Sequence, residues 1–295
     1  MYQVSPDSAS PVVDLVAAPP HPLIALAISS LLIMITWMAL RTLARRFWPD
    51  RKLGMQPSAF TARDVLIVFG LLILGQVAVS MLWLPAPAQG GSPQPMSALL
   101  LAALSLVNIA MVALAISLHR LHCIEKQRSE SLFVATGMRA REAIAYGLLA
   151  LVCFLPAHFG VAIVWELALT GLEVDLDPQE SIVMIMEAIR DKNWGQLAPL
   201  LFFATIVAPI SEEVMFRGLL FRVLRDKGGF FMAAIISSLL FTLLHDSVAS
   251  WGPLMVLGML LAWVYHRSGS LLVSIVLHFA FNAAMISLLF IIGSD

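Results

Sequence analysis

Long apolar runs separated by short polar segments occupy most of this chain of 295 residues. A helix needs about 20 apolar residues to cross the ~30 Å hydrocarbon core of a bilayer. The runs lack the strict alternation of barrel strands, and only helices or closed barrels satisfy their backbone within lipid. We therefore predict an all-α, polytopic transmembrane helical bundle of about eight spans, near residues 23–40, 64–84, 97–118, 143–168, 196–218, 230–245, 251–266 and 270–292.

The polar segments divide the chain into four parts. These are an extended, proline-rich N-terminal tail (1–22), four N-terminal transmembrane helices (23–170), an acidic external loop (171–194) and a C-terminal group of four helices (195–292). Within the acidic loop, apolar residues recur at helical spacing, namely Ile182, Ile185, Met186 and Ile189. This spacing predicts a short amphipathic helix on the outer surface. The pattern assigns the loop no chemical role.

Composition and charge narrow the class of protein further. The chain is 60% hydrophobic and only 13% charged, which excludes an ordinary soluble enzyme. Its net charge of -1 argues against a nucleic-acid partner. Sixteen of the 18 basic residues fall in alternate inter-span segments, and basic segments stay on the cytoplasmic side. We predict an integral, multi-pass protein of the plasma (inner) membrane with both termini outside.

Three ionisable residues, Glu212, Glu213 and Arg217, lie within the fifth predicted span, although the predicted spans contain few charges. A charged group inside a bilayer costs several kcal/mol by insertion scales, so its presence there suggests function. Glu213 and Arg217 are four residues apart and share a helix face, whereas Glu212 is turned about 100° away. Arg217 can hold Glu213 ionised, which leaves Glu212 as a candidate general base that activates water.

Two further polar clusters have helical i, i+4 spacing in later spans. Phe241 precedes His245 by four residues, and His278 precedes Asn282 by four. If the chain reverses at Gly228 and Gly229, Glu212 and His245 lie at similar distances from that turn. We therefore expect the two side chains to meet at one depth in the membrane.

Together these three motifs resemble the CAAX protease and bacteriocin-processing (CPBP, Abi) family of intramembrane endopeptidases, which includes the type II CAAX prenyl endopeptidase. The motifs are Glu-Glu-x-x-x-Arg at 212–217, Phe-x-x-x-His at 241–245 and His-x-x-x-Asn at 278–282. The resemblance covers about residues 195–290, so the C-terminal helices would be a CPBP-type catalytic core. It implies hydrolysis of a peptide bond in a membrane-anchored protein or peptide, within the lipid bilayer.

The resemblance also implies a role for each motif residue. Glu212 would be the base and later the acid, and His245 would position the water. His278 and Asn282 would bind the oxyanion, while Glu213, Arg217 and Phe241 would support the site. The family's history as metalloproteases makes zinc the alternative, with Glu212, His245 and His278 as ligands. We favour the metal-free glutamate mechanism, because Arg217 supplies a cation and no His-Glu-x-x-His motif occurs.

Two alternatives from other functional classes stay open. A proton-coupled transporter would also keep Glu and His within the membrane, although it predicts polar groups and broken helices in both halves of the chain. A non-catalytic or immunity-type membrane protein of the same fold would act through partners. Replacement of Glu212 separates the enzyme from both alternatives.

Overall fold

The computed structural model describes residues 21–47, 57–82, 98–129, 131–133, 138–174 and 176–292. Every element in these residues is a helix. In chain order they are α1 (Pro22–Phe47), α2 (Ala62–Leu82), α3 (Ala98–Glu125), α4 (Ala140–Gly171), α5 (Glu180–Arg190), α6 (Trp194–Phe202), η1 (Phe203–Val207), α7 (Ala208–Glu212), η2 (Glu213–Phe221), α8 (Arg222–Leu243), α9 (Val248–Ser268) and α10 (Leu271–Ile292). Up to residue 20, the predicted tail lies outside the described residues, and Pro22 begins α1, a position that suits proline.

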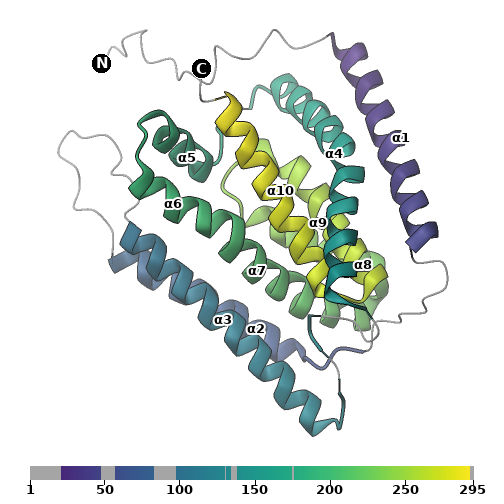
Figure 1. The fold of residues 1–295 in the computed structure, drawn as a ribbon, viewed down its shortest axis with the longest axis vertical. Helices are drawn as coiled ribbons and strands as arrows, with labels where there is room; N and C mark the ends of the chain where they lie inside the picture. Colours follow the sequence, from purple (N-terminus) through teal and green to yellow (C-terminus); the bar gives the residue numbers. More distant parts are fainter. Residues whose placement is uncertain are drawn as a thin grey trace.

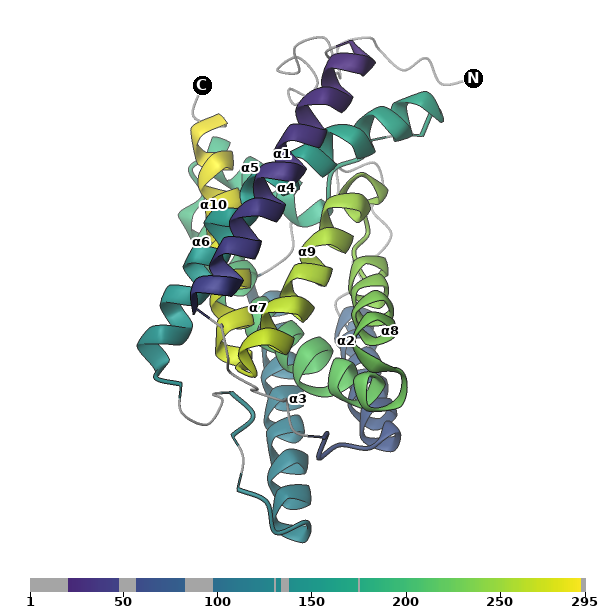
Figure 2. The same cartoon turned by 90° about the vertical axis from the view of Figure 1, so that its right-hand side faces the viewer.

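The helices form a bundle around α4, α8, α9 and α10 (Figure 1). Helix α1 packs along α4, and the α2–α3 pair packs against η2 on another side. The view turned by 90° also shows that the start of α1 and the end of α10 lie at the same end of the bundle (Figure 2). Because α4 shares a hydrophobic cluster with α9 and α10, the N-terminal and C-terminal segments are packed as one body.

The predicted polytopic helical bundle is confirmed, with one difference in how the spans are counted. Seven helical stretches in the described residues are long and apolar enough to cross a membrane, and one of them extends from Trp194 to Leu243. That stretch contains a break at Gly229, whose φ of 76° lies in the left-handed region. Glycine adopts this conformation without steric cost, so the chain bends at the predicted position.

The acidic loop forms the predicted amphipathic helix, α5. Its apolar face is covered by protein, because Met184, Ile185 and Ala188 are buried in a cluster with Leu197 and Leu200 of α6. Helix α5 also contacts α10. The acidic loop is therefore part of the packed bundle at the end where α10 finishes.

Small residues allow the central helices to approach closely. A Cβ atom added to Gly258 of α9 would lie 2.8 Å from Cβ of Ser238 on α8. A Cβ added to Gly147 of α4 would lie 2.9 Å from the carbonyl oxygen of Val273 on α10. Close backbone approach through small residues is how helices associate in lipid, where the hydrophobic effect contributes little.

Candidate active site

The first sequence motif lies on a helix that contains two π-helical turns. Segments η1 (Phe203–Val207) and η2 (Glu213–Phe221) flank the short α7, where a regular helix was expected. Pro209 explains the first irregularity, because proline has no N–H to continue the helical ladder. Wide π-turns are frequent at functional sites, where they change how side chains are presented.

Glu213 and Arg217 form a fully buried ion pair within η2. Nη1 of Arg217 donates to Oε1 of Glu213 at 3.0 Å, and both side chains have 0% exposure. Nη2 of Arg217 donates to the carbonyl oxygen of Gly258 at 3.1 Å. The predicted pairing is present, and the bond to Gly258 adds a partner that sequence spacing does not indicate. Buried charges need such partners, because burial removes their hydration. Arg217 therefore acts here as an internal cation, although the charge count placed it on the cytoplasmic side.

His278 joins the two glutamates. Its Nδ1 lies 3.0 Å from Oε1 of Glu213, and its Nε2 lies 3.6 Å from Oε2 of Glu212. Glu213 is thus held between Arg217 and His278, and the imidazole ring is oriented by a carboxylate. The side chain of Glu212 is 29% exposed, whereas Glu213 is fully buried. The exposed carboxylate is therefore the one that a substrate or water can reach.

Phe241 is the aromatic centre of the site. Its ring centroid lies 4.7 Å from the Arg217 guanidinium, within the range of a cation–π interaction. It lies 5.0 Å from the His245 ring and 5.8 Å from the His278 ring. The second and third motifs therefore meet through this phenylalanine, and His245 packs against the same ring as His278. Nδ1 of His245 makes a 2.9 Å contact with the carbonyl oxygen of Phe241, which leaves Nε2 as its outer nitrogen.

Asn282 lies against η1, and Pro209 explains the contact. The N–H of Ala208 donates to the carbonyl of Phe203, which is the π-helical pattern. In that pattern the carbonyl of Ala204 would receive the N–H of residue 209, which is proline and has none. Nδ2 of Asn282 donates to Ala204 instead, at 2.8 Å. One amide hydrogen of Asn282 is used in this bond, and the amide nitrogen carries a second.

The arrangement offers two of the ligands needed for a zinc site. Tetrahedral ligands about 2.0–2.1 Å from zinc lie roughly 3.3 Å apart. The 3.6 Å separation of Glu212 Oε2 and His278 Nε2 is close to this spacing. However, in the described part of the chain no three His, Cys, Asp or Glu residues converge on a possible metal position. The observed geometry of the described residues therefore does not bring His245 together with Glu212 and His278 as the third ligand of the alternative zinc set.

A segment of the acidic loop holds the turn that carries His245. This turn, residues 244–247, connects α8 to α9. The Ser247 hydroxyl donates to the carbonyl oxygen of Asp177 at 2.6 Å, and the Glu180 N–H donates to Oδ2 of Asp246 at 3.2 Å. The loop therefore braces a candidate catalytic residue, which spacing along the sequence could not reveal. Ser247 and Asp246 in the turn were the residues of the sequence that could have suggested such contacts.

Two tryptophan side chains donate hydrogen bonds to the backbone in this turn and just after it. Nε1 of Trp251 donates to the carbonyl oxygen of His245 at 3.0 Å. Nε1 of Trp165, on α4, donates to the carbonyl oxygen of Val248 at 2.8 Å. A buried indole needs a partner for its single N–H, and both indoles find one next to His245. Neither tryptophan belongs to a motif that could be recognised in the sequence.

Comparisons with known proteins point to the same helices. Residues 194–284 match the family described as Type II CAAX prenyl endopeptidase Rce1-like. A Bacillus subtilis (strain 168) protein named "Putative membrane peptidase YdiL" is 33% identical over 92 residues, which are 31% of this chain and 38% of that protein. The Lactococcus lactis subsp. lactis (strain IL1403) UPF0177 protein YxdF is 34% identical over 93 residues, 30% of this chain and 50% of that protein.

The likeness is confined to one part of each protein. The chain spans between 38% and 50% of the length of these two curated relatives. No solved structure matches the chain. The match includes all three motifs, since 194–284 contains positions 212–217, 241–245 and 278–282.

Proposed function

We propose that this chain, which resembles the type II CAAX prenyl endopeptidase family over residues 194–284, is an intramembrane endopeptidase of the CPBP type. Its substrate would be a membrane-anchored protein or peptide. The observation that carries the proposal is the contact chain Arg217–Glu213–His278–Glu212, which ends on a partly exposed carboxylate inside a helical bundle. A glutamate presented in this way can take a proton from water at a peptide bond.

In the proposed reaction, Glu212 removes a proton from a water molecule while the water oxygen attacks the carbonyl carbon of the peptide. The tetrahedral intermediate then collapses, the C–N bond breaks, and Glu212 returns the proton to the leaving nitrogen. The products are a carboxylate and an amine. His245 packs against the Phe241 ring, which also contacts His278, and would position the water.

The oxyanion would be stabilised by His278 and Asn282. Nδ1 of His278 faces the Glu213 carboxylate, so donation from Nε2 requires a proton on both ring nitrogens. Asn282 would donate the amide hydrogen that does not bond to Ala204. Preorganised donors of this kind are often worth several kcal/mol of barrier. Glu213 and Arg217 hold the donors in place.

The distribution of basic residues along the chain also supports a proposal about its membrane and its orientation. We infer an inner (plasma) membrane protein with both termini outside, since most basic residues outside the site fall in alternate inter-span segments of the sequence. The mechanism we favour needs no metal, and zinc held by Glu212, His245 and His278 is the alternative that a chelator tests.

The decisive experiment uses the full chain reconstituted in phospholipid vesicles with a library of membrane-anchored peptides. Mass spectrometry would identify cleaved bonds for wild type, Glu212→Gln and His245→Gln. We expect Glu212→Gln to lower cleavage by about 10²–10⁴-fold, the usual contribution of a general base. Glu166→Gln is the matched control, because this glutamate also lies in a helix but outside the contact chain.

Two results would overturn the proposal. Equal cleavage by wild type and Glu212→Gln would refute the role of Glu212, and the absence of any cleavage by wild type would favour a non-catalytic protein. Loss of activity with chelator, restored by zinc, would replace the metal-free mechanism with the zinc alternative. A proton-coupled transporter would instead acidify the vesicle lumen in the presence of solute.

A further inference from the structure

The imidazole of His245 is oriented by the end of its own helix. Its Nδ1 lies 2.9 Å from the carbonyl oxygen of Phe241, and a carbonyl oxygen can only accept a hydrogen bond, so Nδ1 carries the hydrogen. In the neutral ring Nε2 then keeps its lone pair, which can accept a hydrogen bond or a proton from water. The direction in which Nε2 points therefore depends on how the backbone at residue 245 is held.

His245 lies between two regular helices. Helix α8 ends at Leu243 and α9 begins at Val248, so the His245 turn, residues 244–247, lies between their hydrogen-bond ladders. The N–H of His245 donates to the carbonyl of Thr242 at 3.0 Å, and its own carbonyl accepts from the Trp251 indole at 3.0 Å. Groups from other helices must hold the rest of the turn.

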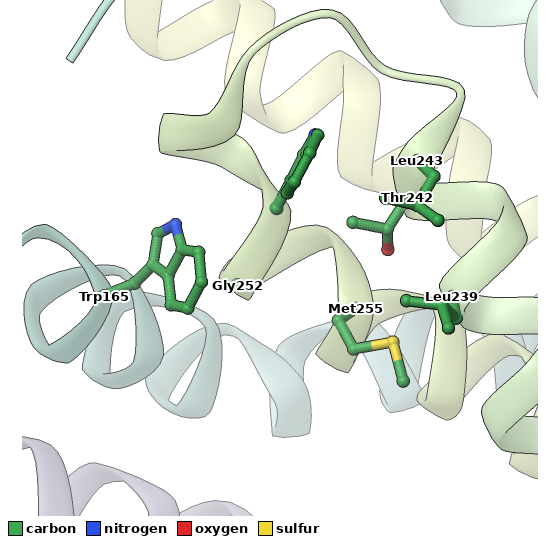
Figure 3. Close-up of a pocket in the computed structure, with 7 residues that line it drawn as sticks. Trp165, Leu239, Thr242, Leu243, Gly252 and Met255 are labelled. Carbon is green, nitrogen blue, oxygen red and sulfur yellow. The ribbon is translucent and has the colours of Figure 1, made fainter. Parts of the chain in front are cut away.

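Helix α4 holds the residue that follows the turn. Nε1 of Trp165 donates to the carbonyl oxygen of Val248 at 2.8 Å. The Trp165 ring lies directly against the backbone of Gly252, since a Cβ atom added to this glycine would be 2.5 Å from the ring (Figure 3). Helices α4 and α9 share a hydrophobic cluster, so the indole is carried by a packed helix. Trp165 therefore ties the first turn of α9 to α4.

Residues 177–180 hold the turn itself. The Ser247 hydroxyl donates to the carbonyl oxygen of Asp177 at 2.6 Å, and Oδ2 of Asp246 accepts from the N–H of Glu180 at 3.2 Å. Glu180 begins α5, so its N–H has no partner within that helix, and a carboxylate is favoured at a helix N-terminus. Helix α5 packs on α6 and contacts α10, which gives these two bonds a fixed support.

We infer that Trp165, Asp246 and Ser247 are positioning residues for His245, and that α4 and residues 177–180 thereby set the geometry of the candidate active site. The inference rests on the proposed endopeptidase function. It adds a role for a part of the chain that precedes residues 194–284, the range over which the chain resembles the endopeptidase family. The three residues act through the backbone of residues 245–248, and none of them needs to touch the substrate.

The first test removes one hydrogen bond and keeps an aromatic ring in place. Trp165→Phe lacks the indole N–H, and kcat and KM would be measured in vesicles with a library peptide that wild type cleaves. We expect kcat to fall by about 10–100-fold, because a misplacement of about 1 Å at a catalytic group can cost about 100-fold. KM should change by less than about 2-fold, since Trp165 makes no contact with the substrate in this proposal.

The matched control for this test is Trp194→Phe. Trp194 begins α6 and is 66% exposed, and within the described residues no hydrogen bond joins its indole to the His245 turn. The substitution removes the same N–H from a tryptophan that does not hold His245. It should keep the wild-type kcat.

A double-mutant cycle distinguishes positioning from general support of the fold. If Trp165 acts through His245, Trp165→Phe should lower kcat by less than about 2-fold in the His245→Gln background. A loss of stability alone would lower kcat by the same factor in both backgrounds. The tautomer of His245, followed by nitrogen-15 NMR of histidine-labelled protein in micelles, is a readout that needs no cleavage. Wild type should carry the hydrogen on Nδ1, and Trp165→Phe should show a mixture of both tautomers.

Asp246 allows a rescue by a conservative variant. Asp246→Asn keeps a side-chain oxygen that can accept from the Glu180 N–H, whereas Asp246→Ala removes it. We expect Asp246→Ala to lower kcat by about 10-fold and Asp246→Asn to keep most of it. Ser247→Ala should act like Asp246→Ala, since it removes the donor to Asp177. These variants decide the question if Trp165→Phe does not fold.

The outcomes separate this inference from the proposed function. If wild type and Glu212→Gln cleave alike, or wild type cleaves nothing, the endopeptidase proposal fails and the inference fails with it. If cleavage depends on Glu212 but Trp165→Phe lowers kcat equally with and without His245, or leaves kcat and the tautomer unchanged, the inference is wrong and the enzyme stands. Equal losses in Asp246→Asn and Asp246→Ala would also overturn it, because the charge of Asp246 and not its hydrogen bond to α5 would then matter.

Discussion

Helix α2 is more apolar than helix α9, yet far less of it is buried by protein. In the most apolar window of α2, with mean hydropathy 2.6, 6% of residues are buried by protein. In that of α9, with mean hydropathy 1.6, 44% are buried. A soluble protein would show the reverse, because there the most apolar helix lies in the core. In a bilayer, lipid accepts apolar side chains, so the helices that contact other helices are those that carry small and polar residues.

The same contrast separates the N-terminal region from the site. Helices α1 and α2 present rows of leucine and isoleucine to the outside, while η2 buries an ion pair completely. Charge can be retained within the membrane only where protein supplies its partners. The candidate chemistry is therefore confined to the part of the chain whose helices include those most buried by protein.

The largest effect should come from breaking the buried pair. Arg217→Ala removes the guanidinium partner of the fully buried Glu213 and leaves that carboxylate with His278 alone, so we expect a loss of about 3–5 kcal/mol in the free energy of unfolding. Denaturant titration in detergent micelles would measure it. Arg45→Ala, at an exposed position of α1, should change stability by less than about 0.5 kcal/mol. Similar small losses in both variants would contradict the contrast between the two regions.

Two glycine substitutions test how closely α9 and α2 pack against their neighbours. Gly258→Ala forces a methyl group against Ser238, and overpacking of this kind costs about 1–3 kcal/mol. Gly70→Ala in α2 meets no atom within 4 Å and should be neutral or stabilising by up to about 1 kcal/mol. Thermal unfolding of the two variants side by side would show opposite signs. Destabilisation by Gly70→Ala would mean that α2 has a neighbour at that face.

The bond between Asn282 and η1 can be tested by rescue. Asn282→Ala leaves the Ala204 carbonyl without its donor, at a cost of about 1–2 kcal/mol, in the lower part of the usual range because Asn282 is half-buried. Adding Pro209→Ala restores a backbone N–H, which should recover part of that loss. The measurement is a double-mutant cycle of unfolding free energies. Additive losses would show that Pro209 and Asn282 do not act on the same carbonyl.

A smaller effect is expected at the start of α2. The Asp64 carboxylate accepts from the Thr61 N–H at 2.6 Å and lies 3.1 Å from Nε2 of His122 on α3. Asp64→Ala removes this capping box and the link between the two helices, at a cost of about 1 kcal/mol. Hydrogen exchange at the first turn of α2 would report the loss. If Asp64→Ala left the exchange rate in the first turn of α2 unchanged but altered exchange in other helices, the capping role would be contradicted.

Much of the architecture could be predicted because it depends on local periodicity. Apolar runs predicted the helices, the glycines at 228 and 229 predicted the break in the long helix, and Ile185 and its neighbours predicted α5. The i, i+4 spacing also predicted the Glu213–Arg217 pair. Each of these features lies within a few turns of one helix, where residue spacing determines which side chains are neighbours.

The remaining features join residues far apart along the chain. These include the bridge from His278 to both glutamates, the Gly258 carbonyl at Arg217, and the indoles that hold the His245 turn. Residue spacing alone does not specify which helix faces which. Once the helices are packed, however, each buried polar group must find a partner within reach.

The amino-acid sequence by itself determined that this protein is a helical bundle in lipid and which residues carry candidate chemistry, because both depend on hydropathy and on the cost of placing charge in a membrane. Only the tertiary structure decided that His278 contacts both glutamates, that Glu213 is enclosed between Arg217 and His278, and that the Trp251 indole donates to the His245 carbonyl. Those relations arise from interhelical packing, which brings together atoms from α4, η2, α8, α9 and α10.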